Sequence, residues 1–204
     1  MRVRTHTNPF NFYQKMTPID FEAAFPNFSG SYDLEIGFGR GKFLRYWSKK
    51  HPERAIIGVE IRQPLVQSLK EQLEEDNVTN ALPIYGSGER FLSDLAPDAS
   101  IDRVFLFHPD PWLKKRYQKR RVINPAMLDQ LAKKMKPKGL FFVSTDVAVL
   151  YEDMVAQLQA HAQFDVQHNH PFFQQDYHTH WQAFSERDSR ESFSACFLRC
   201  MPHS

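Results

Sequence analysis

Short apolar runs alternate with helical patterns from Tyr32 onward, and this alternation limits the possible folds more than any other feature. Runs of apolar and β-branched residues predict strands at residues 32–36, 55–59, 82–85, 101–107 and 140–144. Apolar residues three or four positions apart predict helices at residues 42–50, 65–73, 125–135 and 147–161. Strands that alternate with helices in this way form a parallel sheet whose two faces are both covered by helices.

The last part of the chain breaks the alternation. Residues 164–166 and 192–198 predict two further strands with no helix between them, so we expect an antiparallel hairpin at one edge of the sheet. The predicted fold class is therefore α/β, a single doubly wound, mostly parallel, seven-stranded sheet. Prolines interrupt the periodic stretches of the first thirty residues, which predicts an N-terminal arm at residues 1–30 and one domain at residues 31–204.

Length and composition agree with one globular domain. The chain has 204 residues, of which 42% are hydrophobic and 25% charged, and a chain of this size buries enough surface for a single core. No apolar run approaches the roughly 20 residues of a membrane-spanning helix, and we expect no signal peptide after Met1. Cys196 and Cys200 are the two cysteines, which excludes a disulfide scaffold and predicts reduced thiols in a cytoplasmic protein.

Positive charge is concentrated in one short segment. Residues 114–121 contain six basic residues and no acidic one, although the net charge of the chain is only +2. Such a segment predicts contact with an anionic macromolecule. The alternative is a solvated helix face, but such faces usually mix charges of both signs.

A glycine-rich turn follows the first predicted strand. Gly37, Gly39 and Gly41 stand at alternate positions before a helix, where the backbone can approach a ligand closely and the helix N-terminus offers free N–H groups. Glu35 lies two residues before this turn. Glu60 ends the second predicted strand, where a carboxylate can bind both hydroxyls of a ribose.

Three interpretations of the turn differ in the ligand. A dinucleotide-binding fold uses the spacing Gly-x-Gly-x-x-Gly, which is absent here, and Glu35 would repel a pyrophosphate. A carboxylate at that position suits the ammonium group of an amino acid, so we favour S-adenosylmethionine as the cofactor. The third interpretation is a tight strand–helix turn that binds no ligand.

The fourth predicted strand ends in a rigid polar turn. Pro109 and Pro111 flank Asp110 and fix the direction of its carboxylate, while Trp112 offers a flat surface on which a base could stack. The basic segment follows directly. A carboxylate, a stacking ring and phosphate-binding side chains within a dozen positions indicate an RNA-binding site.

These motifs together resemble those of the bacterial tRNA (guanine-N7)-methyltransferases. The similarity lies in Glu-Ile-Gly-Phe-Gly-Arg-Gly from Glu35, Gly-Val-Glu-Ile-Arg from Gly58, Ser-Thr-Asp from Ser144, and above all Pro-Asp-Pro-Trp followed by Lys-Lys-Arg-Tyr-Gln-Lys-Arg-Arg. The resemblance covers about residues 2–199 and implies the class I S-adenosylmethionine-dependent methyltransferase fold. It also implies methyl transfer to N7 of a guanosine in the variable loop of tRNA.

The glycine turn and the resemblance together predict a set of site residues. The expected cofactor contacts are Glu35, Gly37, Gly39, Gly41, Glu60, Ser87 and Asp110. Asp110, at the junction of cofactor and substrate, is also the expected catalytic residue. The expected substrate contacts are Lys114, Asp146, Thr179 and Gln182. The expected RNA contacts are Lys115, Arg116, Lys119, Arg120 and Arg121.

At two positions the chain departs from the family pattern. Ser87 stands where the family has an acid or an amide near the adenine, and Gln182 stands where the family has a glutamate after Thr179. An amide cannot supply the charge of a carboxylate. Two alternatives therefore stay open: an RNA-binding protein of this fold with little or no turnover, and a paralogue that acts on another RNA position.

Histidines are frequent after Tyr151, but their spacing is irregular and does not match a zinc site, so we interpret them as surface residues. We expect tRNA as the partner, without a membrane or a metal. The sequence leaves a monomer and a homodimer equally open.

Overall fold

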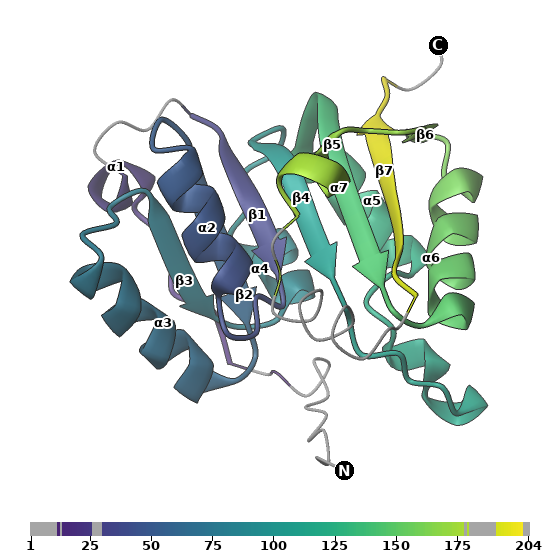
Figure 1. Cartoon of the computed structure of the whole chain (residues 1–204), viewed down its shortest axis with the longest axis horizontal. Coiled ribbons are helices and arrows are strands. Elements are labelled where there is room, and N and C mark those ends of the chain that lie inside the picture. The colour runs from purple at the N-terminus through teal and green to yellow at the C-terminus, as the bar shows by residue number, and fades with distance from the viewer. Residues whose placement is uncertain (1–11, 13, 26–29, 178, 180–190, 202–204) are drawn as a thin grey trace.

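The computed structural model describes residues 12, 14–25, 30–177, 179 and 191–201, which form a seven-stranded sheet with helices on both faces (Figure 1). The strands are β1 (Tyr32–Ile36), β2 (Ala55–Glu60), β3 (Ala81–Tyr85), β4 (Ile101–Phe107), β5 (Met135–Thr145), β6 (Phe164–Gln167) and β7 (Phe193–Arg199). Their order in the sheet is β3-β2-β1-β4-β5-β7-β6.

The direction of the strands confirms the predicted fold class. β1 to β5 pair in parallel, whereas β7 pairs antiparallel with both β5 and β6. The predicted hairpin is therefore present at one edge. Its second strand, β7, is the one that joins the parallel part of the sheet, and β6 forms the outer edge.

The described helices are α1 (Phe21–Ala24), α2 (Lys42–Lys50), α3 (Gln63–Glu75), α4 (Gly88–Asp94), α5 (Pro125–Lys134), α6 (Ala148–Ala160), α7 (Phe172–Gln175) and the 3₁₀ helix η2 (Lys115–Arg120). Among the predicted elements, one boundary differs by more than two residues. β5 begins at Met135 and continues through residues 137–139, where the sequence predicts a turn. The register between β4 and β5 shifts there, and such a bulge accommodates a proline, which cannot donate a ladder hydrogen bond.

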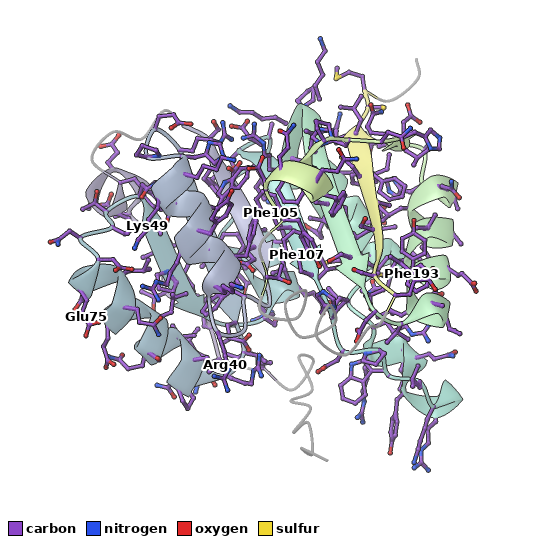
Figure 2. All side chains as sticks on the ribbon, in the orientation of Figure 1. Arg40, Lys49, Glu75, Phe105, Phe107 and Phe193 are labelled. Carbon is purple, nitrogen blue, oxygen red and sulfur yellow. The ribbon has the colours of Figure 1, made fainter. Side chains whose placement is uncertain are left out.

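Two apolar clusters pack on the two faces of the sheet. Val104 and Leu106 of β4 join the cluster formed with α4, α5 and α6. Phe105 and Phe107, both labelled in Figure 2, join the cluster formed with α2, α3 and α7. This alternation is the period of a strand that is buried on both faces, and it explains why β4 is apolar at nearly every position.

The described part of the first thirty residues also contributes to the core. Phe12, Met16 and Phe25 are all buried in the cluster of α4, α5 and α6. A Cβ atom added to Gly86 would lie 2.4 Å from the Met16 methyl group. The segment thus contacts the turn after β3, while a domain boundary near residue 30 stays a prediction.

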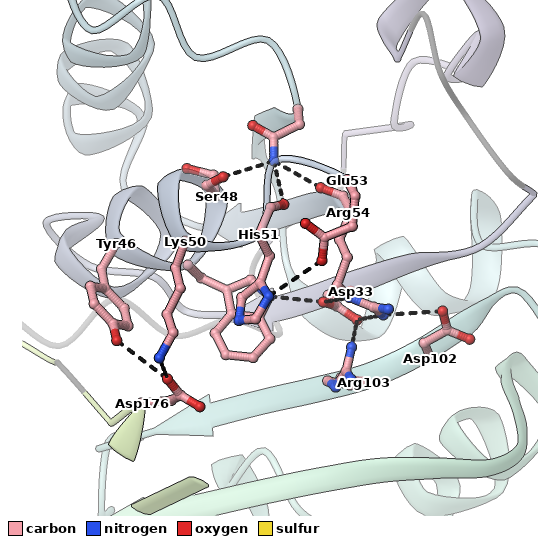
Figure 3. A network of polar contacts seen from close by, with 12 residues as sticks. Asp33, Tyr46, Ser48, Lys50, His51, Glu53, Arg54, Asp102, Arg103 and Asp176 are labelled. Carbon is pink, nitrogen blue, oxygen red and sulfur yellow. Dashed lines mark hydrogen bonds and ion pairs between the residues drawn. The ribbon is translucent and has the colours of Figure 1, made fainter.

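At the amino ends of the strands a buried carboxylate is surrounded by donors (Figure 3). Asp33 of β1 is fully buried and accepts hydrogen bonds from Trp47 Nε1 at 2.8 Å and from Arg54 Nε and Nη2 at 2.8 and 2.7 Å. Arg103 Nη1 lies 3.6 Å from the same carboxylate. Two guanidinium groups therefore compensate the buried charge at this edge of the sheet.

Three further findings concern the whole described chain. Cys196 and Cys200 are both free thiols, and burial raises the pKa of Cys196 to about 12. No helix among the described residues is long and apolar enough to cross a membrane. The described residues also contain no cluster of three or more His, Cys, Asp or Glu side chains that could hold a metal ion.

Candidate active site

The parallel strands bring four predicted carboxylates to one edge of the sheet. Glu35 lies near the carboxyl end of β1 and Glu60 ends β2, while Asp110 and Asp146 follow β4 and β5. The order of these strands is β2-β1-β4-β5, so the carboxylates come from neighbouring strands. This is the edge at which doubly wound sheets bind their ligands.

The glycine turn has the backbone conformation that its sequence predicts. Gly37, Gly39 and Gly41 have φ angles of 74°, 58° and 71°, which lie in the left-handed region that favours glycine. A Cβ at Gly41 would lie 2.4 Å from Leu69 Cδ1 of α3, whereas one at Gly37 would meet no atom within 4 Å. The turn is therefore tightly packed against α3 at Gly41, and it has open space beside Gly37.

Glu60 is buried and holds the turn in place. Its Oε2 accepts the N–H of Gly39 at 2.9 Å. Its two oxygens also accept hydrogen bonds from Arg62, with Oε1 2.9 Å from Nε and Oε2 3.0 Å from Nη2. The half-exposed Arg62 has a raised pKa because of its hydrogen bonds to Glu60, and the charge of Asp110 adds to this effect. The guanidinium group therefore pairs with Glu60 and is near enough to Asp110 to interact with its charge.

Glu35 is buried, and its oxygen Oε2 receives no hydrogen bond from the described residues. Burial, and to a lesser extent the nearby charge of Glu60, raise the pKa of this carboxyl to about 8, against a hydrogen bond from the Leu44 backbone that lowers it. A buried carboxyl with an unused acceptor beside an open glycine turn is ready to bind a cationic ligand group.

Ser87 has a local structural role. It is the N-cap of α4, and its Oγ accepts the N–H of Arg90 at 3.2 Å. The side chain is buried, and its hydroxyl hydrogen is not used in that bond. Ser87 thus lies at the carboxyl end of β3 as predicted, and it can still donate a hydrogen bond there.

The turn after β4 is strained on both sides of Asp110. His108 and Trp112 have φ angles of 48° and 41°, a region that costs free energy for residues other than glycine. The N–H of His108 donates to Ser144 O at 2.8 Å and so extends the pairing of β4 with β5. Asp110 therefore stands on a turn that is fixed by the sheet, by two prolines and by this strained backbone.

The basic segment forms a ladder of cations and rings. The Arg120 guanidinium lies 5.1 Å from the ring centre of Trp112 and 4.6 Å from that of Tyr117, and Arg116 lies 4.7 Å from Tyr117. Lys114, Arg116 and Lys119 are exposed. The 3₁₀ helix η2 (Lys115–Arg120) carries most of the basic segment, including the predicted contact at residue 115. The rings thus hold the arginines in place instead of standing alone as stacking surfaces.

Arg121 differs from the rest of the basic segment. It is buried, its Nη1 lies 2.8 Å from Asp153 Oδ2 of α6, and its Nε donates to Pro111 O at 3.2 Å. These contacts anchor both ends of the loop to α6. The structure therefore gives Arg121 an anchoring position, whereas Lys114, Arg116 and Lys119 are exposed.

A hydrogen-bonded cluster near Asp146 contains two residues that sequence reasoning missed. Asp146 Oδ1 lies 3.4 Å from His108 Nδ1, and His108 Nε2 lies 2.7 Å from the Tyr177 hydroxyl. The predicted residue Thr179 is buried and also hydrogen bonds to Tyr177. A polar residue directly before Pro109 was the only local signal for His108. The predicted contact Gln182 lies outside the described residues.

Known proteins resemble this chain over most of its length. A family model described as "Putative methyltransferase" matches residues 30–193. A tRNA (guanine-N(7)-)-methyltransferase from Microcystis aeruginosa is 33% identical over 181 residues, which cover 86% of each chain. A protein of the same name from Nitrosococcus oceani is 38% identical over 148 residues, which cover 72% of this chain and 62% of that one.

Solved structures share the fold at much lower sequence identity. The 16S rRNA methyltransferase KamB has a TM-score of 0.65 at 15% identity and aligns over 92% of this chain and 96% of its own. An S-adenosylmethionine-dependent O-methyltransferase from Thermotoga maritima has a TM-score of 0.58 at 12% identity, over 86% and 61%. Fold and family model together define the class: an S-adenosylmethionine-dependent methyltransferase.

The sequence relatives give the narrower assignment. At 33% identity over 86% of both chains, the protein belongs to the tRNA (guanine-N7)-methyltransferase family. The resemblance that its motifs suggest is therefore confirmed.

Proposed function

We propose that this protein transfers a methyl group from S-adenosylmethionine to N7 of a guanosine in the variable loop of tRNA. One arrangement carries the proposal: a glycine turn with two buried carboxylates lies at the carboxyl edge of the sheet, and a basic segment whose Lys114, Arg116 and Lys119 are exposed follows β4 at the same edge. The first suits a cationic nucleoside, and the second suits the phosphates of RNA.

The residues of the glycine turn fit S-adenosylmethionine. Glu35 Oε2, which lacks a donor among the described residues, would accept a hydrogen bond from the ammonium group. Glu60 would accept from the ribose hydroxyls after Arg62 moves away from the carboxylate. Ser87 and the backbone of Gly37 and Gly39 would border the rest of the molecule. When bound, S-adenosylmethionine supplies an electrophilic methyl group.

The protein side of the transfer is mainly orientation. Guanine N7 carries a free lone pair at neutral pH, so no side chain has to remove a proton from it. Asp110 and Asp146 would accept from guanine N1–H and the amino group, which selects guanine and fixes the direction of N7. Their charges would also stabilise the positive charge that the purine acquires. The base must leave its stack to reach these residues, which costs a few kcal/mol.

The remaining predicted contacts surround this pair. Thr179 is linked to Asp146 through Tyr177 and His108. Lys114 is exposed, four residues after Asp110 in the chain, and would contact the substrate from there. Lys115, Arg116, Lys119 and Arg120 would bind tRNA phosphates. Arg121 would act by anchoring the loop. A tRNA substrate and the free thiols of Cys196 and Cys200 support a cytoplasmic location.

The direct test is methyl transfer to unmodified tRNA, followed by mapping of the methylated nucleotide. We expect N7-methylguanosine in the variable loop. Methylation at another nucleotide would favour the paralogue, and tight tRNA binding without transfer would favour an RNA-binding protein of this fold.

A second test concerns the basic segment. Replacing Arg116, Lys119 and Arg120 together by glutamine should weaken tRNA binding and flatten its dependence on salt by about 0.7 to 0.9 in logarithmic slope per lost contact. Affinity for S-adenosylhomocysteine should not change. The matched control replaces three exposed lysines on other helices, Lys49, Lys70 and Lys133. An unchanged salt slope in the first variant would show that the segment is only a solvated surface.

A further inference from the structure

His108 lies between β4 and the Pro109–Asp110–Pro111 turn, and its side chain is almost completely buried, with 1% exposed. Its two ring nitrogens contact different partners. Nδ1 lies 3.4 Å from Asp146 Oδ1, and Nε2 lies 2.7 Å from the Tyr177 hydroxyl. The imidazole thus connects a residue beyond β5 with one beyond α7.

Tyr177 continues the connection. Its hydroxyl lies 2.5 Å from Ser144 Oγ, and it also hydrogen bonds to the hydroxyls of Thr179 and Ser192. Burial raises the pKa of Tyr177 to about 12, so the phenol stays protonated at neutral pH. Its ring packs edge-on against Phe107 at 5.0 Å, which fixes where the hydroxyl points.

The chemistry of the partners sets the direction of the hydrogen bonds. An ionised Asp146 can only accept, so His108 Nδ1 must carry the hydrogen. When the imidazole carries this one hydrogen and no second, Nε2 is an acceptor and the Tyr177 hydroxyl donates to it. The Tyr177 oxygen has then used its one hydrogen, so it accepts from the Ser144 hydroxyl at 2.5 Å. A single direction of donation therefore runs from the Ser144 hydroxyl through Tyr177 and His108 to Asp146.

We propose that His108 is a positioning residue for methyl transfer, which holds the Asp146 carboxylate in the orientation that binds the target guanine and couples it to Thr179 through Tyr177. This inference rests on the proposed function of Asp146. Buried, hydrogen-bonded partners of this kind orient the residue that touches the ligand. Asp146 has few rotatable bonds, and a fixed carboxylate needs no reorganisation when the base arrives.

The first experiment reads the hydrogen positions in the free protein. Nitrogen-15 NMR of the imidazole groups should show His108 with hydrogen on Nδ1 and none on Nε2, with the signal assigned by its loss in His108→Asn. Hydrogen on Nε2 and none on Nδ1 would overturn the inference, because His108 could then not donate to an ionised Asp146. This reading does not depend on catalysis, so it tests the inference even if wild-type protein transfers no methyl group to tRNA. That last result would overturn the proposed function.

The second experiment is a double-mutant cycle in kcat/KM for tRNA. His108→Phe should lower kcat/KM about tenfold, the effect of losing one hydrogen bond to a charged group, and should leave S-adenosylhomocysteine affinity unchanged. In an Asp146→Asn background the same change should have little further effect, because its target is gone. Equal losses in both backgrounds would overturn the inference, since His108 would then act independently of Asp146.

Two variants separate positioning from packing. His108→Asn places an amide donor close to the Nδ1 position and tolerates a positive φ, so it should recover most of the activity that His108→Phe loses. His161→Phe removes another histidine–aspartate contact, 3.1 Å to Asp129, at the C-cap of α6, which is the end of that helix away from Asp146, and should leave kcat/KM unchanged. A loss in His108→Asn as large as in His108→Phe would also contradict the inference.

Discussion

Two buried carboxylates stand two residues apart on the same face of β1, and the fold treats them in opposite ways. Asp33 receives a hydrogen bond from Trp47. It also receives hydrogen bonds from Arg54 and lies beside Arg103, as Figure 3 shows. Glu35 has an oxygen without a donor among the described residues and a pKa raised to about 8. At the amino end of β1 the protein supplies the partners of the carboxylate, whereas at the carboxyl end one acceptor of the proposed cofactor contact Glu35 stays unused by the described residues.

The two carboxylates of β1 are therefore expected to support different properties: Asp33 the stability of the fold, and Glu35 the binding of the proposed ligand. A buried carboxylate with its cations in place costs little to keep, and removing one member of the group is expensive. A buried carboxylate without a partner destabilises the empty protein until a ligand supplies the missing charge. Substitutions at the two ends of the sheet should therefore change different measured quantities.

The largest effect is expected at the amino end. Asp33→Asn leaves two arginines beside a neutral amide and should lower the free energy of unfolding by about 3 kcal/mol or more. Urea unfolding at neutral pH measures the loss. Glu35→Gln, at the other end of the strand, should not lower the free energy of unfolding at neutral pH. A loss below about 1 kcal/mol in Asp33→Asn would remove the contrast between the two ends.

The next effect is expected in catalysis and not in stability. Asp110→Asn keeps the shape of the side chain and removes its charge, so kcat/KM for tRNA should fall about a hundredfold, equal to about 2.7 kcal/mol. Asp102→Asn is the matched control, because Asp102 lies at the amino end of the same strand and pairs with Arg54. Wild-type rates in single-turnover transfer by Asp110→Asn would exclude this residue from the site.

Cofactor affinity should show a smaller change. Glu60→Ala removes the proposed ribose acceptor and should weaken S-adenosylhomocysteine binding about tenfold, equal to about 1.4 kcal/mol. Calorimetry on the folded variant measures the affinity. The control is Glu53→Ala, because Glu53 is an exposed glutamate. If the folded Glu60→Ala protein binds as well as wild type, Glu60 does not contact the ribose.

The smallest effect is a change in the dependence of stability on pH. The pKa of Glu35 is raised, first by burial and then by Glu60, from 4.5 to about 8. Folded protein therefore binds more protons than unfolded protein between these values, and stability falls as pH rises through this window. Between pH 7 and 8 the contribution is about 1 kcal/mol. Glu35→Gln should lose this part of the decline, and identical slopes would contradict the raised pKa.

The regular elements were the easiest part to predict from sequence. The strand at residues 101–107 and the helix at residues 42–50 have their predicted bounds, because apolar periodicity alone defines them. Short elements such as α4 and α7 have too few residues for a period to show. The prediction of a turn at the start of β5 was wrong. A proline and a glycine usually mark a turn, but here a bulge beside β4 lets the strand continue through them.

Strand ends predicted the edge at which Glu35, Glu60, Asp110 and Asp146 gather, because parallel topology brings those ends together. Contacts between distant residues could not be predicted in this way. His108 and Tyr177 are 69 positions apart and meet only after β5 and α7 are packed. The bonds of Arg121 likewise depend on where α6 lies, which no pattern in the basic segment records.

The position of β7 inside the sheet sets the order in which the chain can be completed during translation. β6 ends at Gln167, yet its partner in the sheet, β7, begins only at Phe193. At ribosomal speeds of about 5–20 residues per second, β6 waits on the order of seconds before it can pair. Until then the outer edge of β5 has unpaired backbone N–H and C=O groups, to which a chaperone or another chain can bind.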